Sequence, residues 1–381
     1  MKIPFNQPFT IGAELENIAG ALAEGQLSGD GPYTKRCHRW LEERLGCKKA
    51  LLTHSCTAAL EMAAILADTG PGDEVIMPSF TFVSTANAFV LRGGVPVFVD
   101  IRPDTFNLDE RLIEAAVTPA TRAIVPVHYA GVPCEMDAIM AVAAGHGLLV
   151  IEDAAQAILS GYRGRRPGAI GHLGCLSFHE TKNVISGEGG ALLINDPELV
   201  ARAEVIREKG TNRSQFLRGE IDKYTWVDIG SSFLPSELVG AFLYAQLEHA
   251  DAIIAKRQRL CAAYRRGLEE LEHAGLLRLP RPTPTGTAGN AHMFYILLED
   301  LAARTALIQR LQARGVHAVF HYVPLHSSPA GMKFGRAAGA MAVTDDVAGR
   351  LLRLPLYFNL GEDEVAQIVG EIRAFFSAPR A

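Results

Sequence analysis

From residue 49 onward, short apolar runs alternate with longer stretches whose apolar residues recur at helical spacing. The runs that predict strands are KALLTH (49–54), DEVIMP (73–78), PVFVDI (96–101), RAIVPVHY (122–129) and LLVIED, which ends at Asp153. Between them, helices are predicted over TAALEMAAILAD, TANAFVLRGG, DERLIEAAV and EMDAIMAVAAGHG. This alternation predicts an α/β fold with a mainly parallel sheet that is covered on both faces.

The pattern changes after Asp153. Further strand candidates are CLSF (175–178), GALLIN (190–195), AHMFYILLE and VHAVFHYV. The first two are separated by a glycine-rich loop instead of a long helix, which makes this loop the expected catalytic centre. Residues 250–275 predict one long helix, and residues 302–313 predict another. We therefore predict a large domain over residues 1–250 and a small C-terminal α+β domain over residues 251–381.

The composition narrows the class of protein. Of 381 residues, 48% are hydrophobic and 21% are charged, as in ordinary folded domains. The formal net charge is −5, so no basic field exists to attract nucleic acid. The N-terminus lacks the apolar core of a signal peptide, and no apolar run reaches the roughly 20 residues of a membrane span. We expect a cytoplasmic protein without a membrane or nucleic-acid partner.

Metal and disulfide chemistry are not expected. The six cysteines form no CxxC pair, which argues against a thiolate zinc site and against a disulfide framework. His317 and His321 are the closest pair of candidate ligands, but the β-branched and aromatic residues around them predict a strand, where the two would not align as on a helix.

Polar residues that follow the predicted strands are the candidates for chemistry, because open α/β sheets bind ligands at the carboxyl ends of their strands. Ser55-Cys56-Thr57-Ala58 lies between a strand and a helix, where free backbone N–H groups favour a phosphate. A plain helix cap by Ser55 or Thr57 explains the same residues equally well.

Three further side chains stand near strand ends. Asp153 ends an apolar strand, with Gln156 three residues later; it is either a helix cap or the acid that keeps a pyridine nitrogen protonated. Lys182 lies in a short polar loop between two buried strands, where burial and neighbouring cations lower the pKa of an amine and make it nucleophilic. Phe82 is either a core residue or a face for stacking on a planar ring.

With these motifs in place, the chain resembles the DegT-type sugar-nucleotide aminotransferases, which have the fold-type-I pyridoxal-phosphate architecture. The likeness spans nearly the whole chain and includes the segments GQLSGDGPYTKRCHRWLEERLG, GDEVIMPSFTFVSTANAFVLRGGVPVFVDI, VPVHYAGVPCEMD, VIEDAAQA, SFHETKN, GEGGALLIN, HYVPLH and LPLYFNL. The resemblance implies an enzyme that transfers an amino group, by family habit from glutamate, to a nucleotide-linked keto sugar.

The resemblance also implies roles for single residues. Lys182 would hold pyridoxal 5'-phosphate covalently, Asp153 would face its ring nitrogen, Gln156 would lie near its ring hydroxyl and Phe82 would stack on the ring. The phosphate would be held by Ser177 and by the Cys56, Thr57 and Ala58 region, and the substrate by Lys209, Arg213, Tyr322 and His326. The family usually has Gly where this chain has Cys56. Where a partner subunit commonly supplies Asn, this chain has Ser232, so the resemblance implies a homodimer with shared active sites.

Two rival functions and one ambiguous segment remain at this point. The family also contains sugar 3-dehydratases, but these carry His at the position of Lys182. A non-catalytic protein on the same fold would have no reason to keep Lys182, Asp153 and Gln156 together. The basic cluster within 207–216 is either solvated surface charge or, through Lys209 or Arg213, a site for the diphosphate of the substrate.

Overall fold

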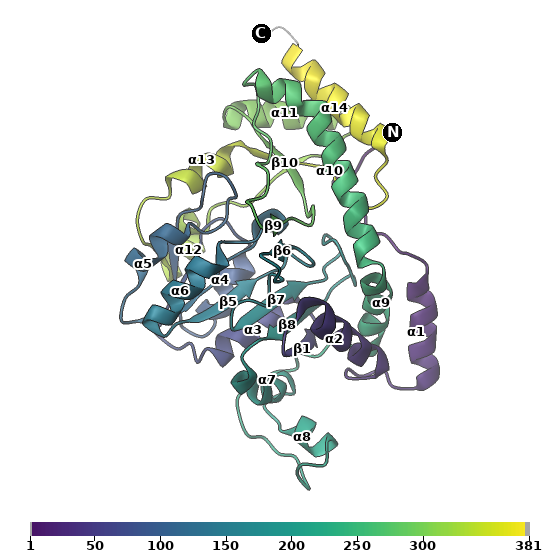
Figure 1. Cartoon of the computed structure of the whole chain (residues 1–381), viewed down its shortest axis with the longest axis vertical. Coiled ribbons are helices and arrows are strands. Elements are labelled where there is room, and N and C mark those ends of the chain that lie inside the picture. Colours follow the sequence, from purple (N-terminus) through teal and green to yellow (C-terminus); the bar gives the residue numbers. More distant parts are fainter. Residues whose placement is uncertain (1, 378–381) are drawn as a thin grey trace.

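The computed structural model describes residues 2–377, which form a large unit built on one sheet and a smaller C-terminal unit (Figure 1). The main sheet has eight strands in the order β1-β8-β7-β5-β4-β2-β3-β12. Their bounds are β1 Lys49–Thr53, β2 Glu74–Pro78, β3 Val95–Val99, β4 Thr121–Ile124, β5 Leu149–Asp153, β7 Leu173–Ser177, β8 Gly190–Ile194 and β12 Arg336–Ala337. Pairing is parallel from β12 through β3, β2, β4 and β5 to β7. The strand β8 is reversed and pairs antiparallel with both of its neighbours, β7 and β1.

Helices cover both faces of this sheet. The helical segments of the large unit are α1 Ala13–Glu24, α2 Pro32–Leu45, α3 Cys56–Leu66, α4 Val83–Val90, η1 Glu110–Leu112, α5 Ile113–Ala116, η2 Tyr129–Gly131, α6 Met136–His146, η3 Pro197–Leu199, α7 Val200–Arg207, α8 Arg213–Leu217 and α9 Glu237–Glu248. Apolar residues of α3, α4 and α7 pack on one face of the sheet. Those of α2 and α9 pack on the other face at one end, and those of α5 and α6 at the opposite end. The predicted α/β class is confirmed.

The C-terminal unit has a core of its own. Its elements are α10 Ala250–His273, β10 Phe294–Leu297, α11 Leu301–Ala313, β11 Val319–Phe320, η4 Leu325–Ser327, α12 Pro329–Phe334, α13 Ala342–Arg350, β13 Leu351–Leu354 and α14 Glu362–Ser377. The short strands β6 Gly161–Tyr162 and β9 Thr287–Ala288 pair with each other. The antiparallel sheet β10-β13-β11 packs against α10, α11 and α14. The domain boundary at residue 250 stays a prediction.

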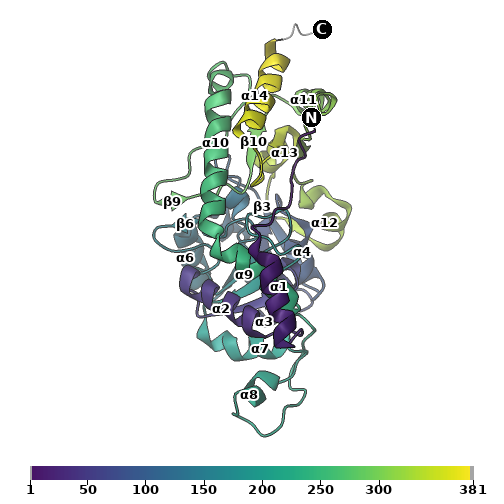
Figure 2. The ribbon, with the colours of Figure 1, turned by 90° about the vertical axis from the view of Figure 1, so that its right-hand side faces the viewer.

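Two segments cross between the units. Ile3, near the N-terminus, belongs to the core of the C-terminal unit and exchanges backbone hydrogen bonds with its neighbours at Gly315 and His317. Figure 2 shows the N-terminal segment running from that unit down to α1. In the other direction, β12 leaves the C-terminal unit and forms the edge strand of the main sheet beside β3.

Three predicted elements differ from the structure. The strand predicted over 122–129 ends at Ile124, because Pro126 lacks the N–H that a central strand needs. The helix predicted over DERLIEAAV is only the short pair η1 and α5. In VHAVFHYV the strand is limited to Val319–Phe320, because Tyr322 has a φ of 34°, in the left-handed region, and Pro324 follows.

Candidate active site

The N-terminus of α3 and the ends of three strands form the first part of the site. In the register of the sheet, Thr53 of β1, Gly190 of β8 and Ser177 of β7 lie side by side. Ser55 is the N-cap of α3, and its Oγ accepts a hydrogen bond from the backbone N–H of Ala58 at 3.1 Å. Capping is therefore a real role of Ser55. Because this cap accepts from Ala58, the backbone N–H groups of Cys56 and Thr57 at the start of the helix are left for a ligand.

Gly190 allows the helix start to lie directly on the sheet. A Cβ at this position would lie 2.4 Å from the carbonyl carbon of Ser55 and 2.5 Å from the backbone nitrogen of Cys56. Across the strand, Ser177 contributes a buried hydroxyl at the same edge. Free N–H groups at a helix N-terminus and a nearby hydroxyl are the donors that bind a phosphate. These residues fit the phosphate of the predicted cofactor.

Asp153 ends β5 as a buried carboxylate. Its Oδ2 accepts a hydrogen bond from Thr85 Oγ1 at 2.8 Å, and its Oδ1 accepts one from the backbone N–H of Ala155 at 3.1 Å. These contacts fix the orientation of the carboxylate and place a negative charge at the base of the site. Such a group fits a protonated ring nitrogen.

Gln156 links this strand end to the C-terminal unit. Its Oε1 accepts a hydrogen bond from the backbone N–H of Ala130 at 2.7 Å, and its Nε2 donates to the hydroxyl of Tyr322 at 2.9 Å. Burial raises the pKa of the Tyr322 hydroxyl, and the nearby charge of Asp153 raises it further. Tyr322 is thus brought to Gln156 and Asp153 by contacts that the sequence alone did not predict.

Lys182 lies in the loop between β7 and β8, partly buried. Burial lowers the pKa of its amine, and the positive charge of Arg353 lowers it further, while Cys56 and Asp153 act in the opposite direction. The expected direction of the pKa change is confirmed. A lowered pKa increases the fraction of uncharged, nucleophilic amine near neutral pH.

Phe82 and His326 occupy different positions around the site. Phe82 is the N-cap residue of α4 and is 58% exposed, so the interpretation as a core residue is wrong and its ring is accessible to a ligand. His326 Nδ1 lies 2.8 Å from Ser79 Oγ, just after β2, and its Nε2 lies 3.4 Å from Asp345. His326 is therefore held at a neighbouring strand end.

Lys209, Arg213 and Ser232 line a hollow of about 250 Å³, together with Ser28 and Gly29. Among residues 2–377, no hydrogen bond or ion pair joins these three residues to Lys182, Asp153 or Gln156. Within one chain they form a separate group.

The basic cluster around this hollow is partly neutralised. Glu208 pairs with Lys209 at 3.4 Å and with Arg213 at 3.3 Å. The buried guanidinium of Arg207 pairs with Asp30 instead of facing solvent. Lys209 and Arg213 keep side chains that are 58% and 45% exposed, so both remain accessible to an anionic ligand.

Sequence reasoning missed three groups that shape the site. Thr85 holds Asp153, and the preceding residue, Glu152, forms a buried pair with His128, with Nε2 to Oε2 at 2.8 Å. Arg353 is the third. Its sequence signal is a charge inside the apolar strand LLRLPL, which a search restricted to strand ends does not reach.

Together these residues suit pyridoxal phosphate. The donor set contains a phosphate cradle at α3, a buried carboxylate, an amide and a lysine whose amine has a lowered pKa. Among the described residues, no group of three or more His, Cys, Asp or Glu side chains is arranged to hold a metal ion, and no helix is long and apolar enough to cross a membrane.

Comparisons with known proteins agree with this chemistry. The model of the DegT/DnrJ/EryC1/StrS aminotransferase family matches residues 10–373. The spore coat polysaccharide biosynthesis protein SpsC of Bacillus subtilis is 33% identical over 97% of this chain and 96% of its own length.

Solved structures show the same likeness in three dimensions. The aminotransferase TlmJ from Streptoalloteichus hindustanus is 31% identical, with a TM-score of 0.91 over 99% of both chains. Spr1654 from Streptococcus pneumoniae, solved in its PLP-form, is 26% identical, with a TM-score of 0.89 over 98% of both chains. The chain therefore belongs to the DegT/DnrJ/EryC1/StrS family and is a pyridoxal-phosphate-dependent sugar aminotransferase.

Proposed function

We propose that this enzyme transfers an amino group from glutamate to C4 of dTDP-4-keto-6-deoxyglucose, giving dTDP-4-amino-4,6-dideoxygalactose. The observation that carries the reaction class is the partly buried amine of Lys182 within electrostatic reach of the buried Asp153 carboxylate. The choice of sugar is supported by residues 207–232, REKGTNRSQFLRGEIDKYTWVDIGSS, which resemble dTDP-4-amino-4,6-dideoxygalactose transaminase more specifically than the rest of the chain.

The side chains of the site have different roles in the proposed reaction. Pyridoxal phosphate, when bound, supplies a conjugated ring that delocalises the electron pair left at carbon when a proton departs. Lys182 Nζ would hold the cofactor and would take the proton from Cα of the amino donor. In the second half of the reaction the same atom delivers a proton to C4 of the sugar. Asp153 keeps the ring nitrogen protonated through its charge, and Thr85 and the N–H of Ala155 hold its carboxylate in place.

We further propose that two copies of the chain complete each other's sites. Residues 208–232, here called the arm, stand away from the body of the molecule around α8 (Figures 1 and 2). The arm exposes the apolar side chains Phe216, Leu217, Tyr224, Trp226, Val227 and Ile229. Apolar side chains gathered on a protruding segment favour burial in an interface. The same segment carries Lys209, Arg213 and Ser232, which would then serve the site of the partner copy.

One incubation tests the proposed reaction. The loaded enzyme, glutamate and dTDP-4-keto-6-deoxyglucose should give a 4-amino sugar with the axial galacto configuration at C4, identified by NMR, and Lys182→Ala should give none. An equatorial amine at C4, or turnover only with another nucleotide-linked keto sugar, would contradict the assignment. The second outcome would leave the aminotransferase chemistry in place and change the substrate.

A further inference from the structure

Arg353 is a charged residue in the middle strand of the small sheet. Its neighbours Leu352 and Leu354 are fully buried in the core with α10, α11 and α14. Side chains alternate along a strand, so Arg353 projects from the opposite face, which is the face toward the main sheet. Directly across from it on β10 is Tyr295, which packs with Phe80 and Tyr129 on that face.

The positive charge of Arg353 has no carboxylate partner among residues 2–377. Its Nε and Nη2 donate to the backbone carbonyl of Phe320 at 3.3 and 3.1 Å, and its guanidinium lies 4.7 Å from the ring centre of Phe5. No hydrogen-bond partner is present for Nη1 in the described chain. The side chain is only partly buried, so an incoming anion can reach it.

Two short connections link this cation to the loop of Lys182 and to Tyr322. Phe5 lies against Arg353, and the next residue, Asn6, donates from Nδ2 to the carbonyl of Glu180 at 3.2 Å, two residues before Lys182. On the other side, Phe320 is followed by His321, which stacks on Tyr322 at 3.6 Å.

The electrostatics agree with this placement. Burial lowers the pKa of the Lys182 amine and that of His321, and the charge of Arg353 lowers both further. Tyr322 in turn accepts the hydrogen bond from Gln156. Arg353 thus projects from the C-terminal unit on the face that carries Tyr295, and its charge acts on Lys182 and His321.

We propose that Arg353 binds a carboxylate of the amino donor while the donor's amino group reacts at Lys182, an assignment that rests on the proposed function. An amino-acid donor such as glutamate carries its carboxylates within a few bonds of its amino nitrogen, so an anion site must lie close to the lysine. A guanidinium with a free nitrogen matches a planar carboxylate in shape and charge. The diphosphate of the nucleotide sugar carries more charge at greater distance from the reacting carbon, and Lys209 and Arg213 are available for it.

Binding of the amino donor and binding of the nucleotide sugar can be measured separately, because each takes part in only one half-reaction. In the absence of sugar, glutamate converts the bound cofactor to its amino form, and the change in absorbance gives the half-saturating glutamate concentration. For Arg353→Met we expect this concentration to rise by about 10- to 100-fold, as for loss of a charge-assisted hydrogen bond. The half-saturating nucleotide sugar, measured with the amino form of the cofactor, should change by less than about twofold. Arg353→Lys keeps the positive charge but lacks the planar guanidinium. Its half-saturating glutamate concentration should lie between those of wild type and Arg353→Met.

A matched control and a binding measurement complete the experiment. Arg314→Met removes an exposed cation of the same unit from the α11 side and should leave both concentrations unchanged. Glutarate, which has both carboxylates of glutamate and no amino group, should bind the wild-type enzyme in calorimetry and bind Arg353→Met at least about tenfold more weakly. Equal glutamate and glutarate affinities in wild type and Arg353→Met would overturn the proposal, as would a larger effect on the sugar. Failure of wild type to respond to saturating glutamate would instead overturn the proposed amino donor, and this assignment with it.

Discussion

Lys182 sits between charges of opposite sign, and this balance decides how readily its amine reacts. Burial and Arg353 lower the pKa of the amine, whereas the charge of Asp153 raises it. Burial also raises the pKa of Cys56, so this thiol stays protonated at neutral pH and does not compete as a nucleophile.

Replacing Lys182 by Ala should abolish transamination together with the absorbance of the covalently held cofactor. No other amine is present in the loop from His179 to Gly189, so no side chain there can take over the bond. The exposed Lys333, replaced by Ala in a parallel variant, should change neither property. Turnover of the Lys182 variant at even a tenth of the wild-type rate would show that the lysine was wrongly assigned.

Asp153→Asn should fold normally and lose turnover by several orders of magnitude, because an amide lacks the charge that keeps the ring nitrogen protonated. Thr85→Val removes one of the hydrogen bonds to this carboxylate and keeps the charge, so its loss of turnover should be much smaller. Steady-state kinetics on both variants, with circular dichroism as the check of folding, makes the comparison. Near-normal turnover of Asp153→Asn would leave Asp153 as a helix cap only.

The pH dependence of cofactor loading should shift in opposite directions in two variants. The uncharged amine is the reactive form, and it predominates above its pKa, so the rate of loading rises with pH through that pKa. Arg353→Met removes a cation, raises the pKa of Lys182 and should move the profile to higher pH. Asp153→Asn removes an anion, lowers the pKa and should move the profile to lower pH. Stopped-flow absorbance of apoenzyme with pyridoxal phosphate measures both, and shifts of the same sign would refute this account of the electrostatics.

At the scale of the element, hydrophobic periodicity was sufficient to predict the helices and strands that bury one face. The strands around Ile76, Val97 and Val150 and the long helix α10 were predicted within a few residues for this reason. Periodicity failed where a single backbone feature intervened, as at Pro126 and at Tyr322 with its left-handed φ.

The same limit applies to the site. Residues at strand ends, such as Asp153 and Lys182, were predictable because a parallel sheet brings its carboxyl ends together. Arg353 was not, because it lies within a strand of the other unit and not at a strand end of the main sheet. The sequence pattern of one chain also does not predict the site that Lys209, Arg213 and Ser232 serve. Within one chain these residues line a hollow that is separate from Lys182.

The packing of α3 on β8 can be tested through Gly190. A Cβ in Gly190→Ala meets backbone atoms of Ser55 and Cys56 that have no side-chain freedom to move away. We expect a loss of about 1–3 kcal/mol in the free energy of unfolding, as for other overpacked sites, and weaker binding of the cofactor phosphate. Gly145→Ala, on the exposed side of α6 with no atom within 4 Å, should be neutral or stabilising. Denaturant unfolding and cofactor titration measure the two effects, and equal stability of both variants would contradict this packing argument.

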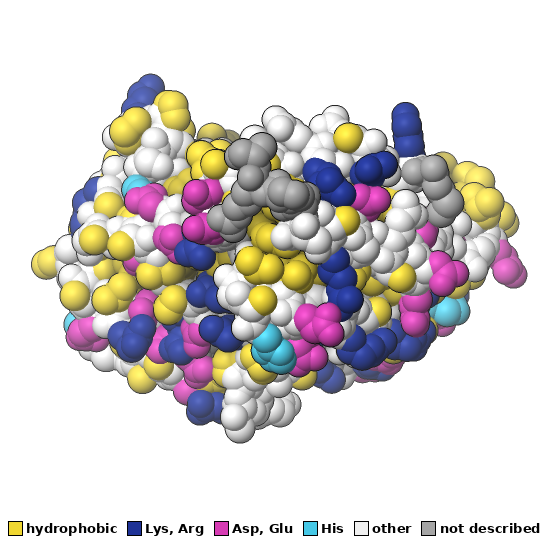
Figure 3. Space-filling view, turned by 90° about the horizontal axis from the view of Figure 1, so that it is seen from above, with side chains coloured by type: hydrophobic (Ala, Val, Ile, Leu, Met, Phe, Trp, Pro, Cys, Tyr) yellow, Lys and Arg dark blue, Asp and Glu magenta, His cyan; other side chains and the backbone are white. Residues whose placement is uncertain are grey.

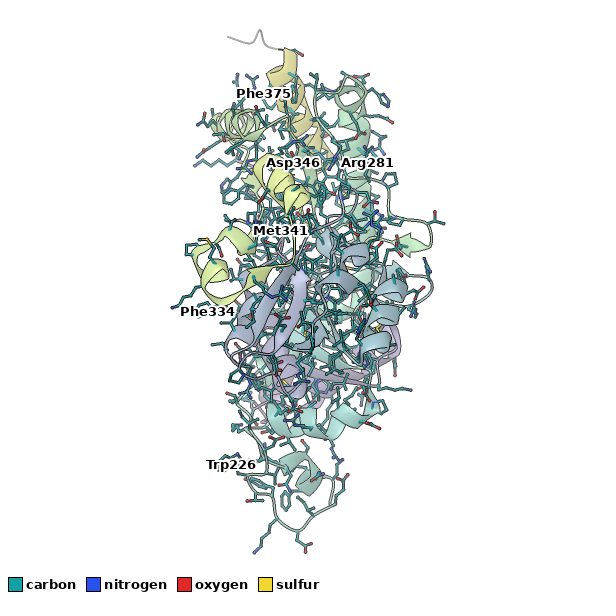
Figure 4. The ribbon with its side chains drawn as sticks, turned by 90° about the vertical axis from the view of Figure 1, so that its left-hand side faces the viewer. Trp226, Arg281, Phe334, Met341, Asp346 and Phe375 are labelled. Carbon is teal, nitrogen blue, oxygen red and sulfur yellow. The ribbon has the colours of Figure 1, made fainter. Side chains whose placement is uncertain are left out.

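At the scale of the whole molecule, the two ends of its long axis differ. Figure 3 looks onto the end that carries α11 and α14, where positive and negative side chains are interspersed. The opposite end is the arm, with the indole of Trp226 at its surface (Figure 4). The exposed apolar side chains of the arm are the surface that the proposed dimer would bury.

Trp226→Ser should convert a dimer into a monomer at micromolar concentration, because the indole is 78% exposed in the single chain and supplies a large apolar surface. Phe334, which is 43% exposed on α12, serves as the control: Phe334→Ser should leave the oligomeric state unchanged. Sedimentation velocity distinguishes the two states. A wild-type protein that sediments as a monomer would remove the proposed dimer and the sharing of sites with it.

Because β12 crosses into the main sheet, a segment that is synthesised late completes a sheet whose other strands are synthesised early. Until residues 336 and 337 arrive, the edge of β3 has no partner, and a bare edge strand is a template for pairing with other chains. The C-terminal core combines Ile3, from the start of the chain, with residues that are made last, such as Val365 and Ile372. Synthesis therefore ends with the large sheet exposed at one margin and the last part of the chain closing it. A nascent or truncated chain that stops near residue 250 thus lacks the strand that pairs with β3, and its exposed edge favours pairing with other chains.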